Sequence, residues 1–510
     1  MRRRSVMAGP KPSAASSPGG PVIVWFRLDL RLADNPALRA AVKAAGQDGI
    51  IPVYIWAPDE EAPFAPGAAS RVWLHDSLRA LSTALDARGS RLILRVGPSL
   101  ETLLELAEKT GARALFWNRR YEPAVAARDA RVDGALRARG LATATDLGLP
   151  SANLLWEPEA LTTKAGQPFR MFTPFWRACR TQPRLDPAPA PARGELSPPR
   201  RWPASVPLAA LGLRPRLGWD AGLRAAWSPG ETGAHASLTQ FVRHGLARYA
   251  QDRDRPDLDA SSRLSPNLHF GEIGPRTVWS TVERAAAQRK IDPSPFLREL
   301  AWREFAHHLL HNFPRSAEAP LRPAFLRFPW APASAARAWR RGLTGYPLVD
   351  AGMRQLWATG FMHNRVRMVA ASFLVKHLLV RWQEGARHFW DTLVDADLAD
   401  NTLGWQWCAG SGADAAPYFR IFNPVIQGRR FDPDGAYVSR WVPELAKLPS
   451  RFIHAPWLAP ADVLARAGVV LGRTYPAPMV DHGWARARAL AAFDEIKASA
   501  ELEDGALRRR

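Results

Sequence analysis

Apolar residues in the first 150 positions form short runs separated by stretches with helical spacing. Four runs rich in β-branched and aromatic residues have the length of strands, at 22–26, 50–56, 91–96 and 114–118. The intervening patterns predict helices at 35–45, 70–89 and 99–111. Strands that alternate with helices predict a parallel sheet with helices on both faces, a Rossmann-like α/β domain over 21–150. No Gly-x-Gly-x-x-Gly follows the first run, which disfavours a standard dinucleotide site.

The pattern changes in the second half, where helical spacing dominates and strand-like alternation is absent. Helices are predicted at 237–254, 295–313, 346–360 and 363–382, within an all-helical domain over 231–495. The proline-rich segment 151–230, above all 182–203, is expected to be an interdomain linker on the surface. The ends, 1–20 and 496–510, are expected to be disordered tails.

Composition narrows the class of protein. A chain of 510 residues is too long for one ordinary core, which agrees with two domains. Its 69 Lys and Arg against 48 Asp and Glu leave a net charge of +21, which favours a polyanionic partner. Charge alone does not distinguish binding of nucleic acid from binding of a membrane surface, or from a charge that serves only solubility. The 21 tryptophans exceed ordinary usage and suggest stacking or electron transfer beside core packing.

Two cysteines, Cys179 and Cys408, provide no disulfide framework, and they fit a reducing, cytoplasmic location. No apolar run is long enough to span a bilayer, so no membrane association is expected. The first 20 residues lack the apolar core of a secretory signal; a transit peptide could look similar, but a disordered tail is the favoured interpretation. We expect a monomer.

Three motifs in the helical half could carry chemistry. The Ser-Ser-Arg-Leu-Ser run at 261–265 offers hydroxyl and backbone N–H groups, either as a phosphate cradle or as an ordinary helix cap. On a helix Glu299, Trp302 and Arg303 share one face, which suits a flat ligand with a polar edge or, alternatively, two docked helices. Asn364, Arg365 and Met368 similarly project from one helical end.

The third motif, DADLADNTLGWQW at 395–407, places Asp395 and Asp397 before Asn401, with Arg367 as a plausible partner of Asp395. A carboxylate pair can bind metal, but the scattered histidines make a metal site unexpected here. Trp405 and Trp407 point in different directions on a helix, so each indole needs a separate environment.

These motifs together resemble the photolyase/cryptochrome family, most closely the bacterial cyclobutane pyrimidine dimer photolyases. The matching segments occur in the family's order over residues 20–490: SRLSPNLHFGEI, ELAWREF, TGYPLVDAGMRQL, MHNRVRM, GWQW and DAAPYFRIFNP. The resemblance implies an N-terminal α/β antenna domain and a C-terminal helical domain that binds one non-covalent FAD.

The resemblance assigns roles to individual residues. FAD would be bound by Tyr249, Ser261, Ser262, Arg263, Leu264, Ser265, Phe296, Arg367, Asp395, Asp397 and Asn401, with Asn401 beside flavin N5. Damaged DNA would be bound by Arg253, Glu299, Trp302, Arg303, Asn364, Arg365, Met368 and Trp407. Glu299 would also stabilise the reacting dimer, and electrons would reach the flavin through Trp330, Trp382 and Trp405.

The implied activity is light-dependent splitting of cyclobutane pyrimidine dimers in UV-damaged DNA, and the alternative is a cryptochrome-like photoreceptor without repair. Asn364, Met368, Asn401 and Trp407 match the repair enzymes rather than the (6-4) enzymes or the plant receptors. Thr402 and Leu403 depart from the common bacterial pattern and suggest another repair subclass. An antenna chromophore such as a folate is less certain to bind, because Ala124 and Val125 replace the usual Asn-Glu anchor.

Overall fold

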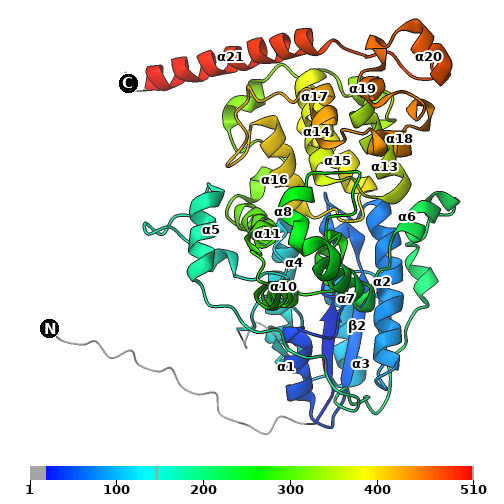
Figure 1. The fold of residues 1–510 in the computed structure, drawn as a ribbon. Coiled ribbons are helices and arrows are strands. Elements are labelled where there is room, and N and C mark those ends of the chain that lie inside the picture. Colours follow the sequence, from blue (N-terminus) through cyan, green and yellow to red (C-terminus); the bar gives the residue numbers. More distant parts are fainter. Residues whose placement is uncertain (1–18, 144–147, 508–510) are drawn as a thin grey trace.

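The computed structural model describes residues 19–143 and 148–507, with side chains as far as residue 498. It contains a parallel α/β domain followed by a helical domain, as the sequence predicts (Figure 1). The predicted tail over 1–20 lies outside the described residues except for Gly19 and Gly20.

The sheet has five parallel strands in the order β3-β2-β1-β4-β5. The strands are β1 (Val22–Phe26), β2 (Ile50–Trp56), β3 (Ile93–Val96), β4 (Ala114–Phe116) and β5 (Ala142–Thr143). Every residue of β1 is buried, which is why its sequence is a continuous apolar run without alternation. The surrounding helices are α1 (Pro36–Ala45), α2 (Ala68–Asp86), α3 (Ser99–Thr110) and α4 (Pro123–Ala138), and the predicted list lacked α4 and β5.

The segment 151–230 is more than a connection. Its central part, 182–203, forms neither helix nor strand, but α5 (Phe172–Thr181) and α6 (Ala221–Ala226) lie on either side of it. Phe172, Phe175 and Cys179 of α5 are buried in a core that they share with α11 (Ser294–Asn312). Proline content therefore marks the irregular part of this segment, whereas α5 packs as part of the helical domain.

The helical domain surrounds the remaining core, and α21 extends beyond the body at the C-terminus (Figure 1). No helix among the described residues is long and apolar enough to cross a membrane. The further helices are α7 (Glu231–Gln240), α8 (Tyr249–Asp252), α9 (Ser265–His269), α10 (Pro275–Arg289), α12 (Arg337–Arg340), α13 (Pro347–Thr359), α14 (Asn364–Ser372), α15 (Trp382–Thr392), α16 (Leu398–Ala409), α17 (Pro424–Phe431), α18 (Ala436–Trp441), α19 (Ser450–Ile453), α20 (Ala461–Ala467) and α21 (His482–Leu507).

One predicted helix boundary and the expected C-terminal tail differ from the structure. The helix predicted over 363–382 ends in a π-helical turn at Phe373–His377, and α15 begins only at Trp382. The chain turns between them because the Leu379 carbonyl accepts a hydrogen bond from Ala331 N and Leu379 adopts a φ of 52°. The expected tail over 496–510 is helical as far as Leu507, since α21 continues through it.

A buried ion pair joins the two domains. Asp34, which follows β1, accepts a hydrogen bond from Arg276 Nε of α10 at 3.0 Å, and the two side chains are 3% and 5% exposed. Arg276 also donates to the Ser151 carbonyl at 2.6 Å. An unpaired charge at this depth would be costly, so the pair ties the position of the sheet to that of α10.

We expect Arg276→Ala to lower the free energy of unfolding by about 3–5 kcal/mol, because it leaves the Asp34 carboxylate buried without its partner. Urea unfolding followed by circular dichroism measures the change. The control is Arg466→Ala, which breaks an ion pair with Asp462 whose side chains are 72% and 64% exposed. It should stay within about 0.5 kcal/mol. Equal losses in both variants would contradict a structural role for the buried pair.

Candidate active site

A cavity of about 560 Å³ opens in the helical domain. Its walls come from α8, α9, α11, α14, α15 and α16 and from the loops before α9, α14 and α16. All the cofactor- and substrate-binding residues predicted from the sequence line it, whereas Trp330 and Trp382 do not. Segments more than 150 residues apart in the chain thus form one site of the size that a large cofactor and its substrate require.

A charged group forms one wall of the cavity. Arg367 Nη2 on α14 lies 3.0 and 2.9 Å from the two carboxylate oxygens of Asp395, and Ser265 Oγ donates to the same carboxylate at 2.6 Å. Arg367 Nε donates to the Met362 carbonyl at 2.6 Å. The guanidinium and the carboxylate therefore hold each other in a fixed orientation, with hydrogen-bonding capacity left for a polar ligand edge.

Asp397 begins α16 and organises the base of the cavity. One carboxylate oxygen accepts from the backbone N–H groups of Ala399 and Asp400 at 3.0 and 3.1 Å, as a helix cap does. The other lies 3.3 Å from His269 Nδ1 and 3.6 Å from His307 Nε2. Burial by itself raises the pKa of this carboxyl, but His307 and His269 lower it below its usual range, so Asp397 is charged.

Helix α16 carries three predicted residues into the cavity. Asn401 donates from Nδ2 to the Ala386 carbonyl at 3.1 Å, which sets the orientation of its amide. Trp405 is buried, with its ring edge-on to Phe389 at 5.0 Å between ring centroids. Trp407 is only half-buried. The two indoles thus occupy different environments, as their spacing on a helix requires.

Aromatic rings form another part of the lining. Tyr249 and Phe296 are both buried and meet edge-on, 5.3 Å between centroids. Trp302 stacks on Phe172 of α5, with centroids 3.7 Å apart and planes within 8°. Since α5 lies in the segment expected to be a linker, the sequence pattern did not reveal this support for Trp302. It fixes the indole plane as part of the cavity wall.

Charged residues are paired at the same cavity. Arg253 donates to Glu299 Oε1 at 2.7 Å, and Arg365 donates to Asp254 Oδ2 at 2.7 Å. Arg303 is different, because it is 10% exposed and donates to the Asn153 carbonyl at 2.6 Å. Arg303 also lines the cavity, and the phosphate contact predicted for it stays a prediction.

The Ser261–Ser265 turn contributes both backbone and hydroxyl groups. Ser262 Oγ accepts from Leu264 N at 3.4 Å, and Arg263 adopts a φ of 52°. The Arg263 guanidinium lies 4.2 Å from the ring centroid of Trp227 and donates to the Ala226 carbonyl. The turn is therefore held from outside the cavity, which leaves its backbone and Ser261 to face a ligand.

Trp330 and Trp382 belong to the same core cluster as Trp405. Trp382 is buried at the start of α15, and Gly385, one turn later, packs against the ring of Trp405. The pairing of Ala331 with Val380 brings half-buried Trp330 beside the segment that leads into Trp382. The three indoles thus belong to one core cluster, with Trp405 and Trp382 buried and Trp330 half-buried against it; their use as an electron relay stays a prediction.

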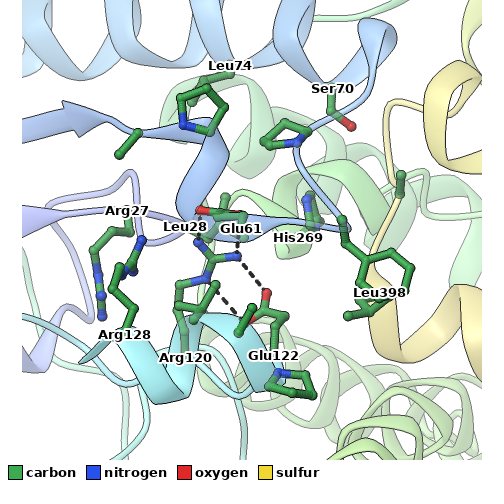
Figure 2. Close-up of a pocket in the computed structure, with 18 of the residues that line it drawn as sticks. Arg27, Leu28, Glu61, Ser70, Leu74, Arg120, Glu122, Arg128, His269 and Leu398 are labelled. Atoms are coloured by element: carbon green, nitrogen blue, oxygen red, sulfur yellow. Dashed lines mark hydrogen bonds and ion pairs between the residues drawn. The ribbon is translucent and has the colours of Figure 1, made fainter. Parts of the chain in front are cut away.

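A second, smaller cavity of about 170 Å³ lies between the sheet and the helical domain (Figure 2). Arg120 points into it and pairs with Glu61 and Glu122, while Ala124 and Val125 form part of its apolar lining. His269 and Ala396 line both cavities, so the two share a wall. The polar groups near the missing Asn-Glu anchor are thus paired with each other; binding of a folate here stays a prediction.

Sequence reasoning missed several residues of the main cavity, among them Asp254, His269, His363 and Asp400. Asp400 directly precedes the predicted Asn401 in the sequence, and both residues line the cavity. Asp254 directly follows Arg253, so a search for acidic neighbours of the predicted arginines would have found it. His269 and His363 lie within the recognised segments SRLSPNLHFGEI and MHNRVRM, but the resemblance assigned neither of them a role.

Two family models match the chain: "DNA photolyase" over residues 22–192 and "FAD binding domain of DNA photolyase" over residues 296–495. The second covers most of the cavity-lining residues described above. A deoxyribodipyrimidine photo-lyase of Agrobacterium fabrum is 49% identical over 94% of this chain and 98% of its own length. The chain belongs to the DNA photolyase family.

Further similarities agree with membership of the DNA photolyase family. The crystal structure of a bacterial class III photolyase from Agrobacterium tumefaciens matches with a TM-score of 0.89, at 48% identity, over 96% of this chain and all of that one. Cryptochrome-1 of Arabidopsis thaliana is 41% identical over 96% of this chain and 73% of its own length. As a member of the family, the chain is an enzyme that binds FAD, and the charged wall and the aromatic lining of the cavity suit such a polar, flat cofactor.

We expect Gly385→Ala to lower FAD occupancy and to reduce the free energy of unfolding by about 1–3 kcal/mol through overpacking. An added Cβ would lie 2.0 Å from Trp405 Cη2, so the indole would have to move into the cavity. Visible flavin absorbance per protein and urea unfolding measure the two effects. The control, Gly134→Ala on α4, has nothing within 4 Å of the added Cβ and should stabilise by about 0.4–1 kcal/mol. Full FAD occupancy in Gly385→Ala would contradict the packing argument.

Proposed function

We propose that this photolyase-family enzyme splits cyclobutane pyrimidine dimers in UV-damaged DNA under light. The observation that carries the proposal is the continuity of one cavity, in which the charged wall of Arg367 and Asp395 and the aromatic residues Trp302 and Trp407 face the same space. A flavin held at the charged wall and a dimer held at the aromatic wall would lie close enough for electron transfer.

Cofactor binding follows from the fixed pairs. Asp395 and Arg367 would bind the polar edge of the flavin, and the turn at 261–265 would bind its phosphates. The Asn401 side chain would face flavin N5, since its amide is already oriented by Ala386. When bound, reduced and excited by light, FAD would supply the electron that opens the cyclobutane ring. The electron would then return to the flavin.

Substrate binding requires the damaged bases to leave the duplex stack. Extrusion costs a few kcal/mol, less at a damaged site. Trp302, braced by Phe172, and the half-buried Trp407 would receive the apolar faces of the two bases. Glu299 and Asn364 would hydrogen-bond to the base edges, and closing the cavity around the dimer would exclude water.

The tryptophan series has a separate role. Trp405, Trp382 and Trp330 would carry electrons from the surface to oxidised FAD, which would restore the reduced cofactor. Trp405 at the cavity wall and Trp382 are buried, whereas Trp330 is half-buried and packs against the same cluster, which supports this direction. Because Trp405 and Trp382 are buried, water would not reach them and compete for the transferred charge.

The second candidate is a blue-light receptor of the cryptochrome kind. The 41% identity to a plant cryptochrome and the tryptophan series both favour it, since light-driven electron transfer would serve a receptor equally well. Trp407 and Asn364 on the cavity wall favour repair, because a receptor that binds no dimer needs no aromatic and amide groups there.

We expect the reduced, FAD-loaded protein to remove dimers from UV-irradiated oligothymidylate under blue light and not in the dark. Dimer content is measured by chromatography after the reaction. Flavin reduction in light without loss of dimers would support the receptor instead. The absence of both dimer loss and flavin reduction would contradict both functions.

We expect Trp407→Ala to weaken binding of the irradiated oligonucleotide by roughly 5- to 150-fold, since stacking on one aromatic ring contributes about 1–3 kcal/mol. FAD content and light-driven flavin reduction should not change, because Trp407 belongs neither to the predicted FAD-binding residues nor to the tryptophan series. Trp484→Ala, at an exposed tryptophan of α21, is the matched control and should bind normally. Loss of FAD in Trp407→Ala would contradict its assignment to the substrate wall.

A further inference from the structure

The helix that carries Asn364 and Arg365 begins with a histidine cap. His363 directly precedes α14, and its Nδ1 accepts a hydrogen bond from the Arg365 backbone N–H at 3.2 Å. Ser, Thr, Asp and Asn are the residues that usually cap helices, because their short side chains reach the same N–H groups. A histidine at this position therefore points to a further contact, which a short side chain could not make.

The second nitrogen of the ring makes that contact. The His363 ring also forms a hydrogen bond with the backbone of Arg253, and this bond raises its pKa, so the ring donates it to the Arg253 carbonyl. Because Nδ1 already accepts from Arg365, the donor is Nε2, and the neutral ring uses its one donor and its one acceptor. His363 thus connects the first turn of α14 with the residue that follows α8.

Both connected segments carry predicted substrate-binding groups. Asn364 and Arg365 begin α14, Arg253 follows α8, and all three line the main cavity together with His363. Asp254 pairs with Arg365 between the same two segments, but its carboxylate is 36% exposed to water. The His363 ring is buried, so it provides a link between the segments that water does not weaken.

The link requires a neutral ring. Burial lowers the pKa of His363 to about 4. Asp254 and the hydrogen bond to Arg253 oppose this effect without cancelling it, and the guanidinium groups of Arg367 and Arg365 add to it. Protonation would place a hydrogen on Nδ1, which could then no longer accept from the Arg365 N–H. The ring is therefore neutral near pH 7, and both of its hydrogen bonds persist.

The FAD-binding group of α14 has other supports. Arg367 donates from Nε to the Met362 carbonyl at 2.6 Å and from Nη2 to Asp395 at 2.9 Å. Neither bond involves the His363 ring, so loss of the link would leave both in place. The link therefore acts on the start of α14, where the predicted substrate residues lie, rather than on the residue that pairs with Asp395.

We infer that His363 is a positioning residue, whose ring fixes the end of α8 against the start of α14 and so holds the substrate-binding groups in place before DNA arrives. Groups that are already ordered lose less conformational freedom on binding, so the affinity is higher. The inference rests on the proposed function, because it requires Asn364, Arg365 and Arg253 to contact the substrate. It gives a role to a residue outside the predicted binding set.

The test compares His363→Asn with His363→Gln in the FAD-loaded protein. Asparagine is a good capping residue, so it keeps an acceptor for the Arg365 N–H, but it is too short to reach the Arg253 carbonyl as well. The amide nitrogen of glutamine lies about as far from the backbone as Nε2 of histidine, so glutamine keeps the donor and loses the cap. Fluorescence anisotropy in the dark gives the affinities for UV-irradiated and unirradiated oligothymidylate.

His308→Asn is the matched control. His308 also links two backbone groups, because its Nε2 accepts from Phe169 N at 3.0 Å and its Nδ1 lies 3.1 Å from the Pro158 carbonyl. It is buried like His363 but does not line the main cavity. The same substitution there removes a similar link without touching the segments that carry Arg253 and Asn364.

We expect His363→Asn to weaken binding of irradiated oligothymidylate about three- to tenfold, the effect of one hydrogen bond, with unchanged FAD content. His363→Gln and His308→Asn should bind within about twofold of the wild type. Normal binding by His363→Asn, or an equal loss in His363→Gln, would show that the link to Arg253 does not position the substrate groups. An equal loss in His308→Asn would overturn the inference as well.

A measurement on the unaltered protein tests the inference even where a variant fails to fold. In ¹⁵N NMR spectra of histidine-labelled wild-type protein, the His363 ring should be neutral and protonated at Nε2 from about pH 6 to pH 8. A ring protonated at Nδ1, or at both nitrogens near pH 7, would contradict the pair of hydrogen bonds on which the inference stands.

The two proposals fail differently. Wild-type protein that does not prefer irradiated DNA would overturn the proposed function, and the inference with it. Wild-type protein that prefers irradiated DNA, together with a His363→Asn variant of unchanged affinity, would overturn the inference alone. Flavin absorbance of every variant confirms that the cofactor site has folded.

Discussion

The site depends on the way in which buried carboxylates hold the first turn of α16. Asp397 caps the helix and stays charged beside His269 and His307, while Asp395 is fixed by Arg367 and Ser265. Everything that α16 carries, from Asn401 to Trp407, takes its position from that turn. A large cavity would otherwise collapse or relax, because its lining lacks the mutual packing of an ordinary core.

The same carboxylates serve stability and chemistry together. A charge buried without partners is strongly destabilising, so each must be paired within the protein before any ligand arrives. Pairing also orients the groups that a flavin would need, which reduces the reorganisation on binding. At Asp254 and Glu299 the pairs are more exposed and can exchange. Depth of burial thus separates pairs that hold the cofactor wall from pairs that can open for a substrate.

Residues outside the recognised motifs complete the site. Phe172 comes from a segment whose proline content suggested a linker, yet it stacks on Trp302. Gly385 allows Trp405 to approach α15 closely, since any side chain there would meet the indole. Neither contact has a sequence signal, because each depends on two elements far apart in the chain that meet only after folding.

Local patterning determined four of the five strands, several of the helices and the division into two domains, because burial imposes a period of two or 3.6 on apolar positions. Resemblance in the order of motifs identified more than half of the residues that line the cavity. Tertiary structure alone decided the break before Trp382, the burial of Arg303 and the pairing of Arg365 with Asp254. Those outcomes depend on which backbone carbonyls and charges come within a few ångströms of one another, and sequence spacing carries no such distances.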